Sequence, residues 1–248
     1  MDLWVRILLV ILVAFGGAFI QRVTGFGFGI FAIMFLPYLV SSYGSATLLA
    51  NLLSVTMSVF IAIKMRKNIQ WKLIIPCMIA GYITTFLAVE FMKGQSNAIL
   101  KAILGGFLIV LSVYFIFVSN RVKIKATLFS GVMLGGLSGA LGGLFSTGGP
   151  PMVIYLLSAT SSVAAYMATM QCHFAIMNMY TIGVKIAAGL LNTEVLILAL
   201  FGYIGVFLGT FLGAKVADRL DGAKFKKTVY GFMAISGVIT LVTALLEL

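Results

Sequence analysis

Two glycine-rich breaks interrupt the apolar sequence, and their residue types are suited to binding an anion. The first is Thr24-Gly25-Phe26-Gly27-Phe28-Gly29, and the second is Ser146-Thr147-Gly148-Gly149-Pro150-Pro151. Glycine allows a ligand to approach the backbone closely, and proline is suited to the first turn of a helix. A helix start presents free N–H groups and a positive dipole end. Each break therefore predicts an anion site, with close helix packing as the alternative role of its glycines.

Polar side chains also recur at helical spacing in the long apolar stretch that follows each break. They are Thr47, Asn51, Ser54 and Ser58 in the first case, and Gln171, Asn178, Thr181 and Lys185 in the second. Residues seven apart share a helix face, and hydrogen bonding between helices is the alternative role, favoured for the serines. The predicted substrate-binding residues are Thr24, Gly25, Gly27, Gly29, Asn51, Ser146, Thr147, Gly148, Gly149, Gln171, His173 and Asn178.

The ionisable side chains and thiols do not form a catalytic set. His173 is the only histidine and lies about 200° around a helix from Gln171. An ionisable group at membrane depth is a functional candidate, although we favour a hydrogen-bonded packing role for it. Cys77 and Cys172 stand in separate apolar stretches without metal-ligand spacing. We therefore expect no catalytic residue, metal or cofactor, and no enzyme.

The composition indicates that these residues are held inside a membrane. Of the 248 residues, 62% are hydrophobic and only 9% are charged, whereas about a quarter of the residues in soluble domains are charged. The net charge of +11 is explained by basic cytoplasmic loops, so nucleic acid is not expected as a partner. The sequence thus predicts an all-α polytopic membrane protein.

The apolar stretches are arranged as a repeat. Two short stretches, about 28–40 and 150–158, follow the breaks, and the long ones are roughly 3–20, 45–63, 72–92, 97–118, 126–145, 162–187, 194–214 and 225–246. Gly16-Gly17 matches Gly135-Gly136, and Gly81-Tyr82-Ile83 matches Gly202-Tyr203-Ile204, in the same order in the two halves. We predict about ten membrane segments in two five-segment halves, 1–120 and 121–248, forming one transport domain.

Loop charges indicate that the second half is inverted. Basic residues gather at 64–72 in the first half but at 215–227 in the second, and these loops are not equivalent. Opposite charge bias in equivalent loops indicates an inverted-topology repeat. With both termini outside, thirteen of the seventeen Lys and Arg residues are cytoplasmic, and Arg6, Lys93, Lys101 and Lys185 are outside. Whether the short segments span the membrane or re-enter stays open.

The acidic residues all fall near segment ends or in loops. They are Asp2, Glu90, Glu194, Asp218, Asp221 and Glu247. Cation pathways in membranes are commonly built on buried carboxylates, so a cation substrate is not expected. Together with Arg22 and Lys185, this favours a small anion as substrate.

The two breaks and their places in the halves resemble the TauE/SafE sulfite exporter family, most specifically in the run FSTGGPPMVIYLL from Phe145 to Leu157. The resemblance covers the whole chain and implies a multi-pass permease of a cell inner membrane for sulfur-containing anions, such as sulfite or sulfoacetate. We therefore predict an exporter that binds a small oxyanion between the breaks near the bilayer middle. Its expected partners are that anion and the lipid bilayer, and a homo-oligomer stays open.

Three other interpretations remain at this point. A proton-coupled permease for another small organic anion would have His173 as its main coupling candidate. An intramembrane thiol redox enzyme would use Cys172. A scaffold for other membrane proteins would explain the hydrophobicity but not the paired breaks.

Overall fold

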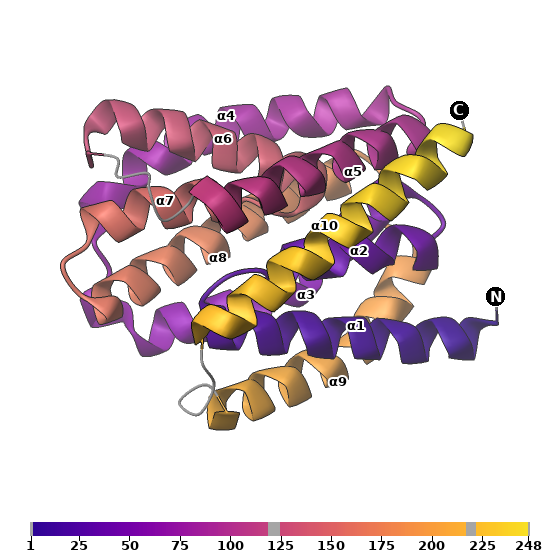
Figure 1. The fold of residues 1–248 in the computed structure, drawn as a ribbon, viewed down its shortest axis with the longest axis horizontal. Helices are drawn as coiled ribbons and strands as arrows, with labels where there is room; N and C mark the ends of the chain where they lie inside the picture. The colour runs from indigo at the N-terminus through magenta and orange to yellow at the C-terminus, as the bar shows by residue number, and fades with distance from the viewer. Residues whose placement is uncertain (1, 119–124, 217–221, 248) are drawn as a thin grey trace.

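The computed structural model describes residues 2–118, 125–216 and 222–247, with the backbone alone for 118 and 222–228. The described residues form ten α-helices and no strand (Figure 1). The helices are α1 (Leu3–Thr24), α2 (Phe28–Leu39), α3 (Tyr43–Lys64), α4 (Trp71–Lys93), α5 (Asn97–Val113), α6 (Leu128–Phe145), α7 (Gly149–Ala159), α8 (Val163–Ala187), α9 (Thr193–Val216) and α10 (Gly222–Leu246). A 3₁₀ turn at Arg66–Asn68 precedes α4, and a π-turn at Tyr114–Val118 continues α5.

Each apolar stretch of the sequence forms a helix, and the two short stretches form α2 and α7 directly after the breaks. Among the described residues, seven helices are long and apolar enough to cross a membrane. They are α1, α3, α4, α5 with its π-turn to Phe117, α6, α9 and the Val229–Leu246 part of α10. Helix α8 is as long as these but is not among the seven, and it carries the strongly polar residues Gln171, His173, Asn178 and Lys185, for which the site gives a reason below.

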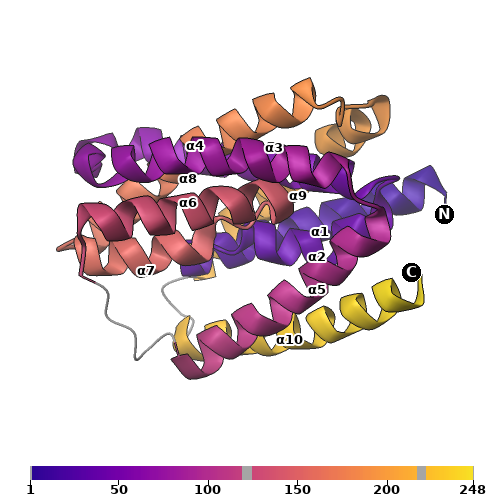
Figure 2. The ribbon, with the colours of Figure 1, turned by 90° about the horizontal axis from the view of Figure 1, so that it is seen from above.

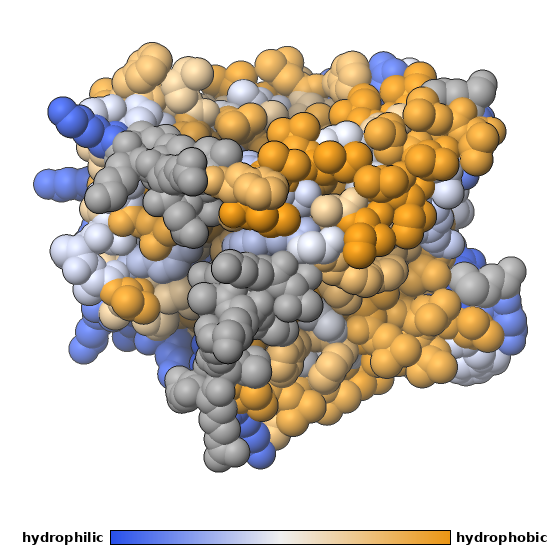
Figure 3. Space-filling model, in the orientation of Figure 1, coloured by the Kyte–Doolittle hydropathy of each residue, from blue (hydrophilic) through white to orange (hydrophobic). Residues whose placement is uncertain are grey.

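The outer surface is apolar. Large side chains such as Phe60, Val110, Phe129 and Phe207 are each more than 60% exposed. Figure 3 shows such residues covering most of one face, with polar residues gathered toward its two ends. A soluble protein rarely exposes an apolar surface of this extent, so the natural surroundings of this face are lipid.

The helices associate in four main pairs: α1 with α9, α4 with α6, α3 with α8, and α5 with α10. Glycine allows three of these pairs to approach closely, including α5 and α10, which meet at Gly105 and Gly237. On α6, a Cβ at Gly139 would lie 2.6 Å from the Cα of Gly81 on α4, and on α9, a Cβ at Gly205 would lie 2.9 Å from the backbone nitrogen of Phe15 on α1. Small residues four apart are a common device for packing helices in membranes. Figure 2 shows α5 and α10 as a pair beside the other helices.

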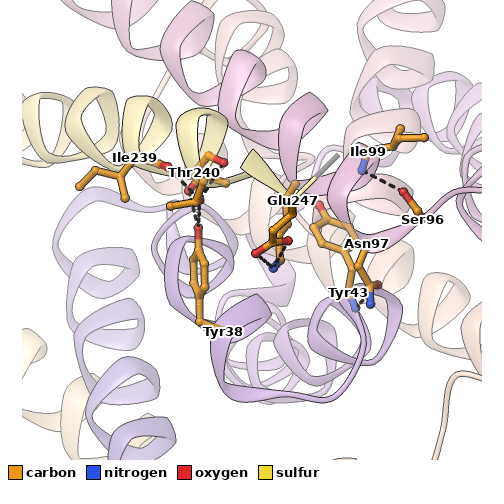
Figure 4. Close-up of polar contacts among 10 residues, drawn as sticks. Tyr38, Tyr43, Ser96, Asn97, Ile99, Ile239, Thr240 and Glu247 are labelled. Carbon is orange, nitrogen blue, oxygen red and sulfur yellow. Dashed lines mark hydrogen bonds and ion pairs between the residues drawn. The ribbon is translucent and has the colours of Figure 1, made fainter. Parts of the chain in front are cut away.

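The start of α1 and the end of α10 lie at the same end of the molecule, and the basic segment 64–72 lies at the other (Figures 1 and 2). Polar contacts tie helices together at the end with the termini (Figure 4): the Tyr38 hydroxyl donates to Thr240 Oγ1 at 3.2 Å, and Lys101 pairs with Glu247 at 3.0 Å. Arg6 pairs there with Glu194. The predicted cytoplasmic residues Arg121, Lys123 and Arg219, and the side chains of Lys224, Lys226 and Lys227, lie outside the described residues.

Candidate functional site

The two breaks are irregular because each contains residues in the left-handed backbone conformation, with a positive φ angle. Gly25 and Gly27 have φ angles of 86° and 110°, and Ser146 has φ 57°. Among the described residues, Ser146 is the only one other than glycine with a positive φ, a conformation that is uncommon for a residue with a Cβ. The breaks also touch, since a Cβ on Gly29 would overlap the carbonyl oxygen of Ser146.

A buried cavity lies where the breaks meet and where α2 and α7 begin. Its volume is about 50 Å³, and a water requires roughly 10–15 Å³ on this measure. It is therefore large enough for a few waters or one small oxyanion. The lining residues are Gln21, Phe26, Gly27, Gly29, Ile30, Ser54, Ser58, Thr85, Ser138, Gly139, Gly142, Ser146–Pro150, His173, Phe174, Met177, Asn178 and Thr181.

Backbone donors face this region from both helix starts. In the second break, Thr147 N–H donates to the Leu141 carbonyl at 3.3 Å, and Pro150 and Pro151 carry no N–H group. This leaves the N–H groups of Gly148 and Gly149, which have no acceptor among the described residues. The first turn of α2 likewise starts with free donors, as every helix does.

Three polar atoms of the cavity wall lack a hydrogen-bond partner among the described residues: Ser58 Oγ, Thr147 Oγ1 and His173 Nδ1. All three side chains are at most 3% exposed. A buried polar atom without a partner costs about 1–3 kcal/mol, so a polar occupant of the cavity, water or ligand, would stabilise the protein by bonding to these atoms. The other ring nitrogen of His173 lies 3.5 Å from Ser138 Oγ, which itself donates to the Gly148 carbonyl at 2.6 Å.

Side-chain amides hold the two breaks in a reciprocal way. Gln171 Nε2 on α8 donates to the Gly25 carbonyl at 2.9 Å, and Asn51 Oδ1 on α3 lies 2.9 Å from the Ser146 hydroxyl. Asn51 Nδ2 then donates to Asn178 Oδ1 at 2.7 Å, joining α3 to α8. Each break is thus held by the first long helix after the other break.

The structure brings most of the predicted site residues to this one cavity. Gly27, Gly29, Ser146, Thr147, Gly148, Gly149, His173 and Asn178 line it, whereas Gly25, Asn51 and Gln171 do not and instead bond to its frame. Thr24 lines a separate small cavity against Tyr230 and Met233. Its hydroxyl is within hydrogen-bond distance of the Ile20 and Phe26 carbonyls.

Lys185 corrects one interpretation of the loop charges. We expected it in an outside loop, but it lies within α8 and is 0% exposed. Its Nζ donates to Asn51 Oδ1 at 2.8 Å and to Ser146 Oγ at 3.3 Å. The physical reason is that Lys185 follows Asn178 by seven residues, so it shares the helix face that packs on α3. The same spacing from Asn51 places Ser58, for which we favoured a structural role, on the cavity wall.

The described cavity wall carries no thiol and no set of side chains that could together hold a metal ion. None of its described lining residues is Asp or Glu, and no three His, Cys, Asp or Glu of the described residues come close enough to hold a metal ion. Cys77 and Cys172 are buried free thiols outside the cavity wall. The arrangement offers hydroxyls, amides and backbone N–H groups, which suit an anion that accepts several hydrogen bonds.

Fold and site together define a multi-pass helical membrane protein with a small polar cavity between two broken helices. The family model for the sulfite exporter TauE/SafE matches residues 9–240. The chain belongs to the TauE/SafE sulfite exporter family, a family of membrane transporters. Neither the curated proteins nor the solved structures that were compared contain a match.

Proposed function

We propose that this protein exports small sulfur-containing oxyanions, such as sulfite or organosulfonates, across a cell inner membrane. The substrate binds in the cavity between the two breaks, near the bilayer middle. Family membership supports the substrate class, and the cavity supports the location of the site.

The observation that carries this proposal is the set of unpartnered polar atoms on the cavity wall. Ser58 and Thr147 each offer a hydroxyl, and His173 offers a ring nitrogen. An oxyanion has several acceptor oxygens and would accept hydrogen bonds from the hydroxyls and from the free N–H groups of Gly148 and Gly149. Hydrogen bonds to a charged acceptor are roughly twice as strong as neutral ones.

An inverted repeat is the second part of the proposal, and the packing supports it. If α1–α5 correspond to α6–α10, the α1–α9 pair corresponds to the α6–α4 pair. The α3–α8 and α5–α10 pairs then join equivalent helices. The left-handed residues Gly25 and Ser146 end α1 and α6, and an amide from the opposite half contacts each one. We place both termini outside, so that the basic segment 64–72 is cytoplasmic.

Charge movement gives the direction of transport. The inside-negative potential contributes about 2.3 kcal/mol per charge per 100 mV, so a dianion that leaves the cell gains about twice that value. Export therefore runs downhill in the field without a coupled ion. Flux that is unaffected by the sign of an imposed potential would indicate a coupled ion and would favour the proton-coupled alternative.

The test of the site is to remove one unpartnered hydroxyl. Thr147→Val keeps the shape of the side chain, and among the described residues the hydroxyl has no bond to lose. We expect the protein to remain as stable as the wild type, and its KM for sulfite in proteoliposomes to rise about tenfold, the scale of one hydrogen bond to a charged group.

Thr84→Val is the matched control. The Thr84 hydroxyl donates to the Gly136 carbonyl at 2.7 Å and is not part of the cavity wall. This variant should unfold more easily, by about 1 kcal/mol, and keep the wild-type KM. A Thr147→Val protein with wild-type KM would exclude this cavity as the site.

A further inference from the structure

Lys185 is a buried lysine without a carboxylate partner in the part of the chain that the structure describes. The described ion pairs join Arg6 to Glu194, Lys93 to Glu90, and Lys101 to Glu247. All three pairs involve partly exposed side chains, whereas Lys185 is fully buried. Its two partners, Asn51 Oδ1 and Ser146 Oγ, are neutral oxygens.

A buried ammonium is costly unless a negative charge lies near it. Polar residues inside membranes are therefore rare and are commonly functional. The hydrogen bonds to Asn51 and Ser146 satisfy two donors of the lysine, but they supply no countercharge. Some other negative charge must stabilise the lysine when it is charged.

A single side chain separates the cavity from this lysine in space. Ser146 lines the cavity and accepts from Lys185 Nζ, and Asn178 lines it and bonds to the Asn51 side chain that also accepts from Lys185. An anion in the cavity would thus be separated from the ammonium by a single layer of neutral side chains. Because the effective dielectric of a protein interior is low, an ammonium and an anion separated by one side chain would attract each other strongly.

We propose that Lys185 supplies the fixed positive charge that makes this cavity select anions, and that the bound anion is its countercharge. The proposal rests on the proposed function. It assigns to Lys185 a role that differs from that of the hydrogen-bonding wall: the wall recognises oxygen atoms, and the lysine recognises charge. Asn51 and Ser146 keep the ammonium behind the wall, so that it attracts the substrate without forming a direct ion pair that would slow release.

The experiment measures the KM for sulfite flux in proteoliposomes for three variants. Lys185→Met removes the charge at similar length, Lys185→Arg keeps it, and Lys101→Met removes a lysine whose pair with Glu247 lies at the end of the molecule. We expect Lys185→Met to raise KM about tenfold or more, the scale of one nearby charge. Lys185→Arg should restore most of the affinity, and Lys101→Met should leave it unchanged.

A second readout separates a charge effect from a packing effect. Sulfate and perchlorate are both tetrahedral but carry two charges and one, and each can be measured as an inhibitor of sulfite flux. Coulomb energy is linear in charge, so the fold loss for sulfate in Lys185→Met should be about the square of the loss for perchlorate. Lys185→Gln, which keeps a donor toward Asn51 and Ser146, replaces Lys185→Met if that protein does not fold.

Two results would overturn the role of Lys185 while leaving the proposed function intact: a wild-type KM in the uncharged variants, or equal losses for sulfate and perchlorate. If the wild-type protein moves no sulfite, the proposed function fails, and the role of Lys185 fails with it.

Discussion

At the scale of single residues, the candidate site combines neutral polar groups with a buried lysine behind them. Thr147, Ser58 and His173 present atoms that the described protein leaves unpartnered, while Lys185 is held back by Asn51 and Ser146. The neutral hydrogen-bonding groups would select the shape of the ligand, and the fixed charge would select the sign of its charge. A small oxyanion needs both to be distinguished from water and from cations.

Asn51→Asp gives a prediction at this scale. The new carboxylate would stand 2.8 Å from Lys185 Nζ, where the amide oxygen is now, and would neutralise the charge that we assign to anion selection. We expect affinity for sulfite to fall at least tenfold, as measured by calorimetry on purified protein. Asn51→Asp combined with Lys185→Met would leave the carboxylate unpaired and should bind sulfite more weakly still. Wild-type affinity in Asn51→Asp would contradict this account.

The sequence identified most of the residues that the structure brings together at the cavity, but not the buried contacts of Lys185. The glycines, prolines and hydroxyl residues of the breaks indicate where backbone N–H groups could bind a ligand. Glycine allows close approach to the backbone, and proline is suited to a helix start. Lys185 was counted both among the outside loop charges and on the polar helix face of the stretch 162–187, because it lies two residues before the end of its helix. The heptad from Gln171 through Asn178 to Lys185 was the available signal, but it does not say which neighbouring helix that face meets.

At the scale of elements, the short helices α2 and α7 begin at the same cavity. The long helices that pack closely around them hold them in place. The bounds of all ten described helices followed the apolar runs, because an apolar run ended by glycine, proline or charge has few other structures available in lipid. The pairing of α6 with α4 and of α9 with α1 could not be predicted. A row of glycines shows that a neighbour comes close, but not which neighbour it is.

Two glycine substitutions test the packing of these elements. A Cβ at Gly139 would overlap the backbone of α4 at Gly81, whereas nothing lies within 4 Å of a Cβ at Gly106. Gly139→Ala should lower the unfolding temperature in detergent and reduce flux. Gly106→Ala should raise stability by about 0.5–1 kcal/mol, because alanine is the better helix former. Equal effects of the two changes would show that α4 and α6 do not approach as described.

At the scale of the whole molecule, an apolar outer surface lies between two polar ends, and the cavity is buried between the two halves. Helix α8 carries strongly polar side chains because they meet α3 and the first break: Lys185 bonds to Asn51, Gln171 bonds to Gly25, and Asn178 lines the cavity. An inverted repeat would allow one half to rock against the other around a fixed central site. Such movement would open the cavity to each side in turn.

The orientation gives a prediction for the whole molecule. Lys67 and Lys93 are exposed at the ends of their helical regions, and the proposed topology places them on opposite sides. A Lys67→Cys protein should be labelled by a membrane-impermeant thiol reagent only after the cells are opened, and Lys93→Cys should be labelled on intact cells. The wild-type protein is the blank, since Cys77 and Cys172 are buried. Labelling of Lys67→Cys on intact cells would reverse the orientation.

The central claim is that an oxyanion binds between the two breaks, and locating the anion tests it most directly. Selenite has the shape and charge of sulfite, and its selenium atom can be found by anomalous diffraction from crystals of the protein soaked in it. The account predicts one selenium position in the cavity, within hydrogen-bond distance of the Thr147 hydroxyl and of the N–H groups of Gly148 or Gly149. It also predicts that the occupancy of this position falls in Thr147→Val crystals soaked at a selenite concentration near the wild-type Kd. Selenium bound elsewhere, with the cavity filled only by water at saturating selenite, would contradict the account.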